Sequence, residues 1–239
     1  MSFFFLDSTI LIIVPALIFA LWAQYKVKST YKKYAQVASQ SGMTGADVAR
    51  AILAQEDIAL VSNPTAMPEG SACGLMAIPG HLTDHYDPRD RILRLSEEVY
   101  HGRSVASLGI AAHEVGHAIQ HARLYSPLMM RNIVYPVCNV GSTLAFPLFF
   151  IGFLFSFPAL LQIGIFLFTL SVFFTVLTLP VEFNASSRAM RALASGGYLS
   201  QDELYGARKV LSAAAMTYVA AAAMAILQLV RMIFLSNRN

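Results

Sequence analysis

The chain has 239 residues, of which 56% are hydrophobic and only 13% are charged, and its formal net charge is +3. Ordinary soluble proteins carry about a quarter charged residues, so this composition favours a membrane protein. No basic stripe with interleaved aromatic residues occurs, so no nucleic-acid partner is expected. The two cysteines, Cys73 and Cys138, form neither a disulfide framework nor a thiolate metal motif.

The first apolar segment runs from about Phe3 to Ala23 and is long enough to cross a bilayer. No positive charge precedes it and no small-residue cleavage pattern follows it, which argues against a cleaved signal peptide. A cluster of lysines comes directly afterwards: Lys26, Lys28, Lys32 and Lys33. We therefore expect residues 1–24 to form a first transmembrane helix whose C-terminal end faces the cytoplasm.

The polar region that follows, residues 25–132, is predicted to be a small cytoplasmic α+β domain. Thr44 and Asp47 form a capping-box pattern, which predicts a helix from there through about Ala54. Ser104 is a good N-cap for a second helix.

The strands of this domain are predicted from short apolar runs and turn residues. Residues 58–62 are a candidate strand, and the Pro-, Gly- and Ala-rich stretch 63–80 is predicted to be a loop. Residues 81–86 and 91–96 can pair as a hairpin across Asp87-Pro88-Arg89-Asp90, which has suitable turn chemistry.

The most informative motif is His113-Glu114-Val115-Gly116-His117, which has the form H-E-x-x-H. On a helix, residues four apart lie on one face, so both imidazoles can reach the same metal ion. The Glu beside the first His is then placed to take a proton from a metal-bound water. The motif predicts a Zn²⁺ site with His113 and His117 as ligands and Glu114 as the catalytic residue.

The largest apolar block lies between Arg131 and Glu182 and contains no Asp, Glu, Lys or Arg. As one helix, its roughly fifty residues would be about 75 Å long, against a hydrocarbon core of about 30 Å. Residues 133–180 are therefore predicted to form a transmembrane hairpin. Its turn is expected at Ser156-Phe157-Pro158, with kinks at Pro136 and Pro147 and a helix end at Pro180.

The last apolar segment, residues 211–239, is predicted to be a fourth membrane helix, and a surface helix packed on the other spans is the alternative. The connecting segment 181–210 carries Arg188, Arg191, Arg208 and Lys209, and the hairpin turn carries no charge. By the positive-inside rule, residues 25–132 and 181–210 share the cytoplasmic side.

Two residues compete as the third zinc ligand. His121 lies four residues beyond His117, but His113 to His121 spans about 12 Å of helix rise, too far for one ion. We therefore interpret His121 as a helix-surface residue. Glu182 is the first charge after the apolar block, and a carboxylate at a membrane edge is costly unless something compensates it. An even number of spans between His117 and Glu182 would return Glu182 to the face of the two histidines.

Three further stretches resemble a known family: residues 80–88 (GHLTDHYDP), 99–104 (VYHGRS) and 180–186 (PVEFNAS). Together with residues 112–120 (AHEVGHAIQ), they look like the YugP-type membrane zinc metallopeptidases. That family is a bacterial gluzincin group, similar in plan to HtpX and the CaaX prenyl proteases. The resemblance covers most of the chain. It implies His113, His117 and Glu182 as zinc ligands and Glu114 as the catalytic Glu.

The expected molecule is a mainly α membrane protein with about four transmembrane helices and a small zincin-like cytoplasmic domain. Its expected activity is zinc-dependent hydrolysis of a peptide or membrane-protein substrate at the bilayer. A second donor to the oxyanion could come from His81, His85, Tyr86 or Arg188. Asn184 and Ser186 could support the ligands through hydrogen bonds.

Two alternatives remain open from the residues. In an intramembrane site-2-type protease, the H-E-x-x-H helix itself would lie in the bilayer, although the Asp-Gly ligand motif of such enzymes is absent from this chain. In a non-catalytic membrane scaffold, the zinc would be structural, and such sites usually have four protein ligands.

Overall fold

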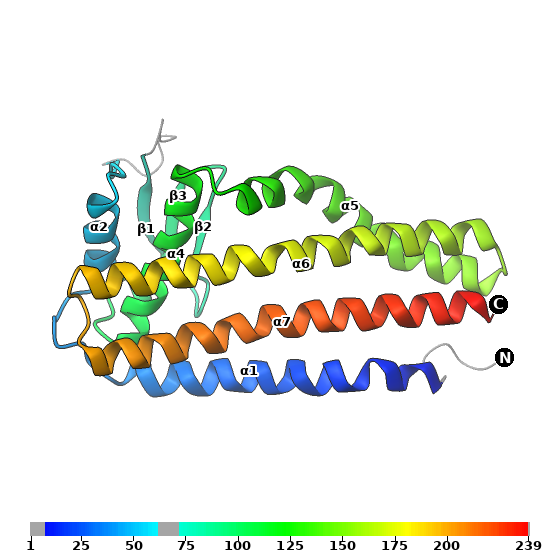
Figure 1. Cartoon of the computed structure of the whole chain (residues 1–239), viewed down its shortest axis with the longest axis horizontal. Helices are drawn as coiled ribbons and strands as arrows, with labels where there is room; N and C mark the ends of the chain where they lie inside the picture. The colour runs from blue at the N-terminus through cyan, green and yellow to red at the C-terminus, as the bar shows by residue number, and fades with distance from the viewer. Residues whose placement is uncertain (1–7, 62–71, 239) are drawn as a thin grey trace. The chain divides into compact units, whose positions relative to one another are not determined.

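The computed structural model (Figure 1) describes residues 8–61 and 72–238. The described chain divides into two compact units. Among the described residues, the first unit comprises residues 8–25, 129–180 and 216–238. The second comprises residues 26–61, 72–128 and 181–215, so it contains the H-E-x-x-H motif, Glu182 and most of the polar residues.

The first unit is built from a short 3₁₀ helix, Ser8–Ile12, and parts of the four longest helices. These are α1 (Val14–Ala35), α5 (Ser126–Leu154), α6 (Pro158–Ser195) and α7 (Gln201–Asn237). The predicted hairpin turn is confirmed, because α5 ends at Leu154 and α6 begins at Pro158, with Ser156 at φ 50° between them. Pro136 and Pro147 both lie inside α5.

Helices α5 and α6 approach closely within the first unit. A Cβ on Gly164 would lie 2.8 Å from the backbone nitrogen of Phe149 and 2.9 Å from the carbonyl oxygen of Ala145. Small residues at such crossings let two membrane helices pack backbone to backbone. Phe149, Leu161 and Met232 are buried beside this contact.

Three helices in the described part of the chain are long and apolar enough to cross a membrane. They are α5, α6 and α7, with mean hydropathies of 1.8, 2.3 and 2.0. The sequence predicts about four spans, and three of them are found as candidates among the described residues; α1 is not one of these three. Its C-terminal half carries four lysines, and the apolar segment predicted at residues 1–24 begins in residues outside those described.

The second unit contains a three-stranded sheet in the order β1-β3-β2. The strands are β1 (Gly74–Ile78), β2 (His85–Asp87) and β3 (Ile92–Ser96). The predicted hairpin is confirmed in its pairing, since β2 is antiparallel to β3 with Tyr86 opposite Leu93, although β2 is shorter than expected. This order leaves β2 at one edge of the sheet.

Strand β1 corrects the prediction of a loop over residues 63–80. It pairs in parallel with β3, so that Gly74 lies opposite Ile92. The strand predicted at residues 58–62 is reduced to one bridge, between Leu60 and Cys73, and Ser62 lies outside the described residues.

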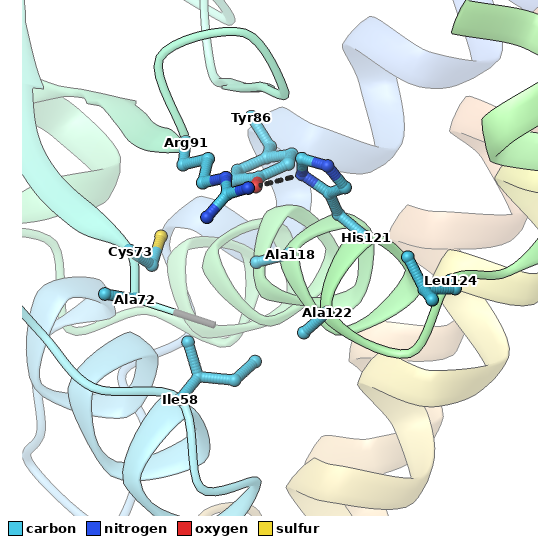
Figure 2. Close-up of a pocket in the computed structure, with 9 residues that line it drawn as sticks. All are labelled: Ile58, Ala72, Cys73, Tyr86, Arg91, Ala118, His121, Ala122 and Leu124. Atoms are coloured by element: carbon cyan, nitrogen blue, oxygen red, sulfur yellow. Dashed lines mark hydrogen bonds between the residues drawn. The ribbon is translucent and has the colours of Figure 1, made fainter. Parts of the chain in front are cut away.

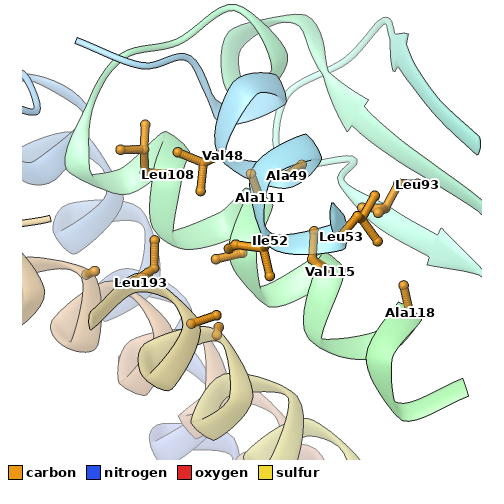
Figure 3. Packing of buried hydrophobic residues seen from close by; sticks show 14 of the residues in the cluster. Val48, Ala49, Ile52, Leu53, Leu93, Leu108, Ala111, Val115, Ala118 and Leu193 are labelled. Atoms are coloured by element: carbon orange, nitrogen blue, oxygen red, sulfur yellow. The ribbon is translucent and has the colours of Figure 1, made fainter. Parts of the chain in front are cut away.

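Three helices complete the second unit: α2 (Gly45–Gln55), α3 (Glu97–Tyr100) and α4 (Val105–Ala122). The capping box at Thr44 and Asp47 and the Ser104 N-cap are both confirmed, while α3 was not predicted. Figure 3 shows the core between α2, α4, β3 and the second-unit part of α6. The residues labelled there include Ile52, Leu93, Val115 and Leu193, all fully buried.

Pro180 lies inside α6 and does not end the helix, which corrects the predicted boundary. Proline removes one backbone hydrogen bond, but the residues that follow gain burial against α4. Val181 and Ala185 are both fully buried. At their contact with α4, a Cβ on Gly116 would lie 2.5 Å from the carbonyl oxygen of Ala185. The glycine inside the H-E-x-x-H motif therefore permits the approach of α6.

This contact yields a stability prediction. Replacing Gly116 by Ala should destabilise the fold by about 1–3 kcal/mol, because the methyl group would overlap backbone and one helix must move. The control is Gly141→Ala in α5, where the added Cβ would lie 3.6 Å from its nearest neighbour, the Leu167 carbonyl oxygen. This substitution brings the same gain in helix propensity as Gly116→Ala. Thermal unfolding in detergent should give a lower midpoint for Gly116→Ala alone. Equal midpoints for the two variants would contradict the close packing.

Candidate metal centre

Three potential metal ligands converge inside the second unit. His113 and His117 lie one helical turn apart on α4, and Glu182 faces them from α6. The Nε2 atoms of His113 and His117 lie 3.4 Å and 3.5 Å from Glu182 Oε2. The nearest ligand atoms of the three side chains are all within 4.8 Å of one another.

The two histidine–glutamate separations match the spacing between ligands of a shared zinc ion. Zinc binds imidazole nitrogen and carboxylate oxygen at about 2.0–2.2 Å in tetrahedral geometry, so two of its ligands lie about 3.4 Å apart. Glu182 is only 4% exposed, and burying a carboxylate is costly unless cationic partners face it. The donor set of two imidazoles and one carboxylate suits zinc and leaves a fourth position open.

The outward-facing nitrogens of both histidines have partners that fix the rings. His113 Nδ1 lies 3.1 Å from Ser186 Oγ, and His117 Nδ1 lies 3.0 Å from Gln120 Oε1. Because an amide oxygen only accepts, the hydrogen bond to Gln120 places the proton of His117 on Nδ1. The Nε2 lone pair of His117 is then directed toward Glu182, as metal binding requires.

Gln120 links the histidine to the helix that carries the carboxylate. Its Nε2 donates to the Val181 carbonyl oxygen at 2.7 Å and to Asn184 Oδ1 at 3.0 Å. Asn184 Oδ1 also accepts from Arg188 Nε at 2.8 Å. Gln120 is fully buried, and both its donor hydrogens and its acceptor oxygen are used. One amide therefore sets both the ring orientation of His117 and the position of α6.

Glu114 lies beside the cluster and is positioned by the edge strand. Its Oε2 accepts a hydrogen bond of 3.0 Å from the backbone N–H of Tyr86 in β2. The side chain is 8% exposed, and this burial raises the pKa of the Glu114 carboxyl to about 7. The edge of β2 and the functional face of α4 thus meet at this carboxylate.

His121 lies outside the three-ligand cluster and is half-buried in a small pocket of about 180 Å³ (Figure 2). The Tyr86 hydroxyl lies 2.8 Å from His121 Nδ1. Burial lowers the pKa of His121 and raises that of Tyr86, so both side chains are favoured in their neutral forms. The Cys73 thiol in the same pocket has its pKa raised to about 12 by burial, which makes it a poor nucleophile.

The remaining side chains predicted as oxyanion donors are hydrogen-bonded to other groups in the structure. His81 pairs with Glu98 at 2.7 Å, and His85 Nδ1 lies 2.8 Å from the Thr83 carbonyl oxygen. Arg188 bonds to Asn184 and lies over the ring of Tyr125. The backbone N–H of Tyr86 donates to the predicted catalytic residue Glu114, and the identity of the oxyanion donor stays a prediction.

The sequence interpretation missed the role of Gln120. Its position three residues after His117 places it on the same face of α4, which is a usable signal for a supporting side chain. The expected hydrogen bond between Ser186 and a histidine ligand is present, whereas Asn184 reaches His117 only through Gln120.

An arrangement of two imidazoles, one carboxylate and an adjacent Glu is typical of zinc-dependent hydrolases. Residues 9–237 match the model of a family described as "putative neutral zinc metallopeptidase". The chain is 47% identical over 232 residues to "Putative membrane protease YugP" of Bacillus subtilis (strain 168). The match covers 96% of this chain and 98% of that protein. No solved structure matches the chain.

The chain therefore belongs to this family of zinc metallopeptidases. The family implies Zn²⁺, and the described residues contain one group of side chains able to hold it: His113, His117 and Glu182. The name of the relative and the three apolar helices together indicate a membrane protein.

The hydrogen bonds of Gln120 generate a metal-affinity prediction. Gln120→Leu should weaken zinc binding by about 10–100-fold, because His117 loses its orienting acceptor and two buried oxygens lose their donor. Competition against a chelator of known affinity would measure the change. The control is Gln55→Leu, which removes only an exposed hydrogen bond to Ser195. Unchanged affinity in Gln120→Leu would show that the amide does not position the ligand.

Proposed function

We propose that this protein is a membrane-bound zinc endopeptidase with His113, His117 and Glu182 as metal ligands and Glu114 as general base. The observation that carries the proposal is the convergence of both Nε2 atoms on Glu182 Oε2, at 3.4 Å and 3.5 Å. Histidine and glutamate side chains from two helices meet at the spacing expected for a tetrahedral zinc site.

Zinc in this site would supply a Lewis acid that lowers the pKa of a bound water to about 7 and polarises the substrate carbonyl. Glu114 would take a proton from the attacking water and then pass it to the leaving amine. The Tyr86 N–H holds one carboxylate oxygen of Glu114, so the second oxygen stays available for this transfer. Gln120 and Ser186 would keep the two histidine rings in their binding orientation.

The expected substrate is an extended peptide, either free or part of a membrane protein. Strand β2 lies at the edge of the sheet, and the Tyr86 N–H on its outer side points to Glu114. A peptide that adds as a further strand beside β2 would therefore run past the general base. Strand addition to an exposed edge is a common way to bind extended peptides.

The sidedness of the site follows from the order of the helices. The apolar parts of α5 and α6 stand between His117 and Glu182 in the sequence. If both cross the bilayer, Glu182 returns to the side on which α4 lies, as a shared metal requires. The lysines and arginines of residues 26–33 and 181–210 favour the cytoplasmic side in a multi-pass arrangement.

Two observations favour this peptidase over the alternatives. Helix α4 is not among the three described helices apolar enough to span a membrane, which disfavours an intramembrane H-E-x-x-H site. Among the described residues, the ligand group has three members, whereas structural zinc sites usually have four.

The substitution Glu114→Gln tests the proposed chemistry. Turnover of a fluorogenic peptide library should fall by at least about 10²–10⁴-fold, because the amide cannot accept the proton of the attacking water. Zinc content, measured by mass spectrometry of the purified protein, should stay near that of the unmodified chain.

The matched control is Glu97→Gln, which neutralises a carboxylate on α3 and should leave both readouts unchanged. Full peptide turnover by Glu114→Gln would contradict the proposed role of Glu114. Loss of zinc from that variant would instead make Glu114 a ligand, and the assignment of Glu182 would then fail.

A further inference from the structure

A second, larger cavity lies in the same unit, away from the candidate metal ligands. Its volume is about 940 Å³, within the range of ligand clefts. It is lined by the C-terminal half of α1 and residues just after it, by residues 81–82, by Glu98 of α3, and by residues 102–107 at the start of α4. None of His113, Glu114, His117 and Glu182 lines it.

Three basic side chains line this cavity: Lys28 and Lys32 on α1, and Arg103 in the segment before α4. The two lysines are four residues apart, so they share one face of the helix, and like charges at this spacing repel. Neither lysine nor Arg103 makes a side-chain hydrogen bond or ion pair within the described residues 8–61 and 72–238. An anion in the cavity would offset their mutual repulsion.

Glu98 is the one carboxylate among the lining residues, and its Oε2 already has two partners. The Tyr31 hydroxyl donates to it at 3.0 Å, and His81 Nδ1 lies 2.7 Å away. The hydrogen bonds from His81 and Tyr31 hold the pKa of Glu98 below its usual range. Three cations thus face one engaged carboxylate, and the lining keeps an excess of positive charge.

The inner wall of the cavity adds hydroxyl groups and a helix end. Ser104 and Ser107 are buried there, with their Oγ atoms 2.9 Å apart. Ser104 caps α4, an 18-residue helix whose N-terminal dipole favours a nearby negative charge. The positive end of this helix dipole therefore adds to the positive charge of the three basic side chains.

We propose that this cavity binds a phosphate-bearing anion, supplied either by the headgroup of an anionic phospholipid or by free phosphate. Arginine and lysine together are the usual partners of phosphate, the first through its planar fork and the second as a point charge. The volume exceeds that of one phosphate and accommodates a glycerol headgroup as well. Lys28 also follows closely on Trp22 and Tyr25, exposed aromatic residues of the kind enriched at membrane interfaces.

The test uses the full chain in a neutral detergent and follows its thermal unfolding midpoint. Phosphatidylglycerol, phosphatidylcholine and inorganic phosphate are added separately at matched phosphate concentration. Phosphatidylglycerol should raise the midpoint by about 5 °C near saturation, because a ligand of the folded state stabilises it. Phosphatidylcholine should produce no comparable shift.

Two double variants on one helix provide the matched comparison. Lys28→Gln/Lys32→Gln should abolish the shift, whereas Lys26→Gln/Lys33→Gln removes the same charge from residues outside the cavity lining and should retain it. Midpoints without lipid show whether each variant folds. Arg103→Gln, in the segment before α4, should weaken the shift without any change to α1.

The outcomes separate the two sources and the two explanations. A shift with phosphatidylglycerol alone identifies a lipid headgroup, and an equal shift with inorganic phosphate identifies a soluble anion. If both lysine double variants lose the midpoint shift equally, the lipid is attracted to the charged surface in general, and the proposed site is overturned. The absence of any shift would overturn it as well.

Discussion

The candidate metal centre depends on the close contact between α4 and the second-unit part of α6. Gly116 lets the backbone of α6 approach until a Cβ would be 2.5 Å from the Ala185 carbonyl oxygen. Glu182 stands one helical turn before Ala185, so this approach brings its carboxylate to the two imidazoles. Glycine inside the H-E-x-x-H motif therefore sets the distance that the metal chemistry needs.

Hydrogen bonds then convert this helix contact into ligand geometry. Gln120 on α4 and Ser186 on α6 each hold one histidine ring, and Gln120 also bonds to the backbone beside Glu182. Because a buried amide without partners is costly, the orientation of His117 and the position of α6 stabilise each other. The candidate metal centre is thus part of the packing that holds the second unit together.

Local sequence signals predicted much of the second unit. The capping box at Thr44, the N-cap at Ser104 and the turn between β2 and β3 are short-range patterns whose physical basis lies within a few residues. The spacing of His113 and His117 placed them on one helix face for the same reason. The end of the apolar block singled out Glu182, which the structure brings beside them.

The predictions from the sequence were wrong or incomplete where contacts between residues far apart in the sequence decide the structure. Strand β1 exists because it pairs in parallel with β3, and the Pro- and Gly-rich composition before it suggested a loop. Pro180 predicts a helix end, but α6 continues through it. The burial of Val181 and Ala185 against α4 outweighs the one backbone hydrogen bond that proline removes. Gln120 was overlooked because its partners, Val181 and Asn184, are far away in the sequence.

The central claim is that two imidazoles and one carboxylate hold the same ion, and X-ray absorption at the zinc edge of the metal-loaded protein tests it directly. The account predicts four nitrogen or oxygen neighbours at about 2.0–2.2 Å, with the multiple-scattering signature of two imidazoles and no sulfur. In Glu182→Ala, the same spectrum should lose its carboxylate contribution. A single imidazole, a sulfur ligand, or a spectrum unaffected by Glu182→Ala would contradict the account.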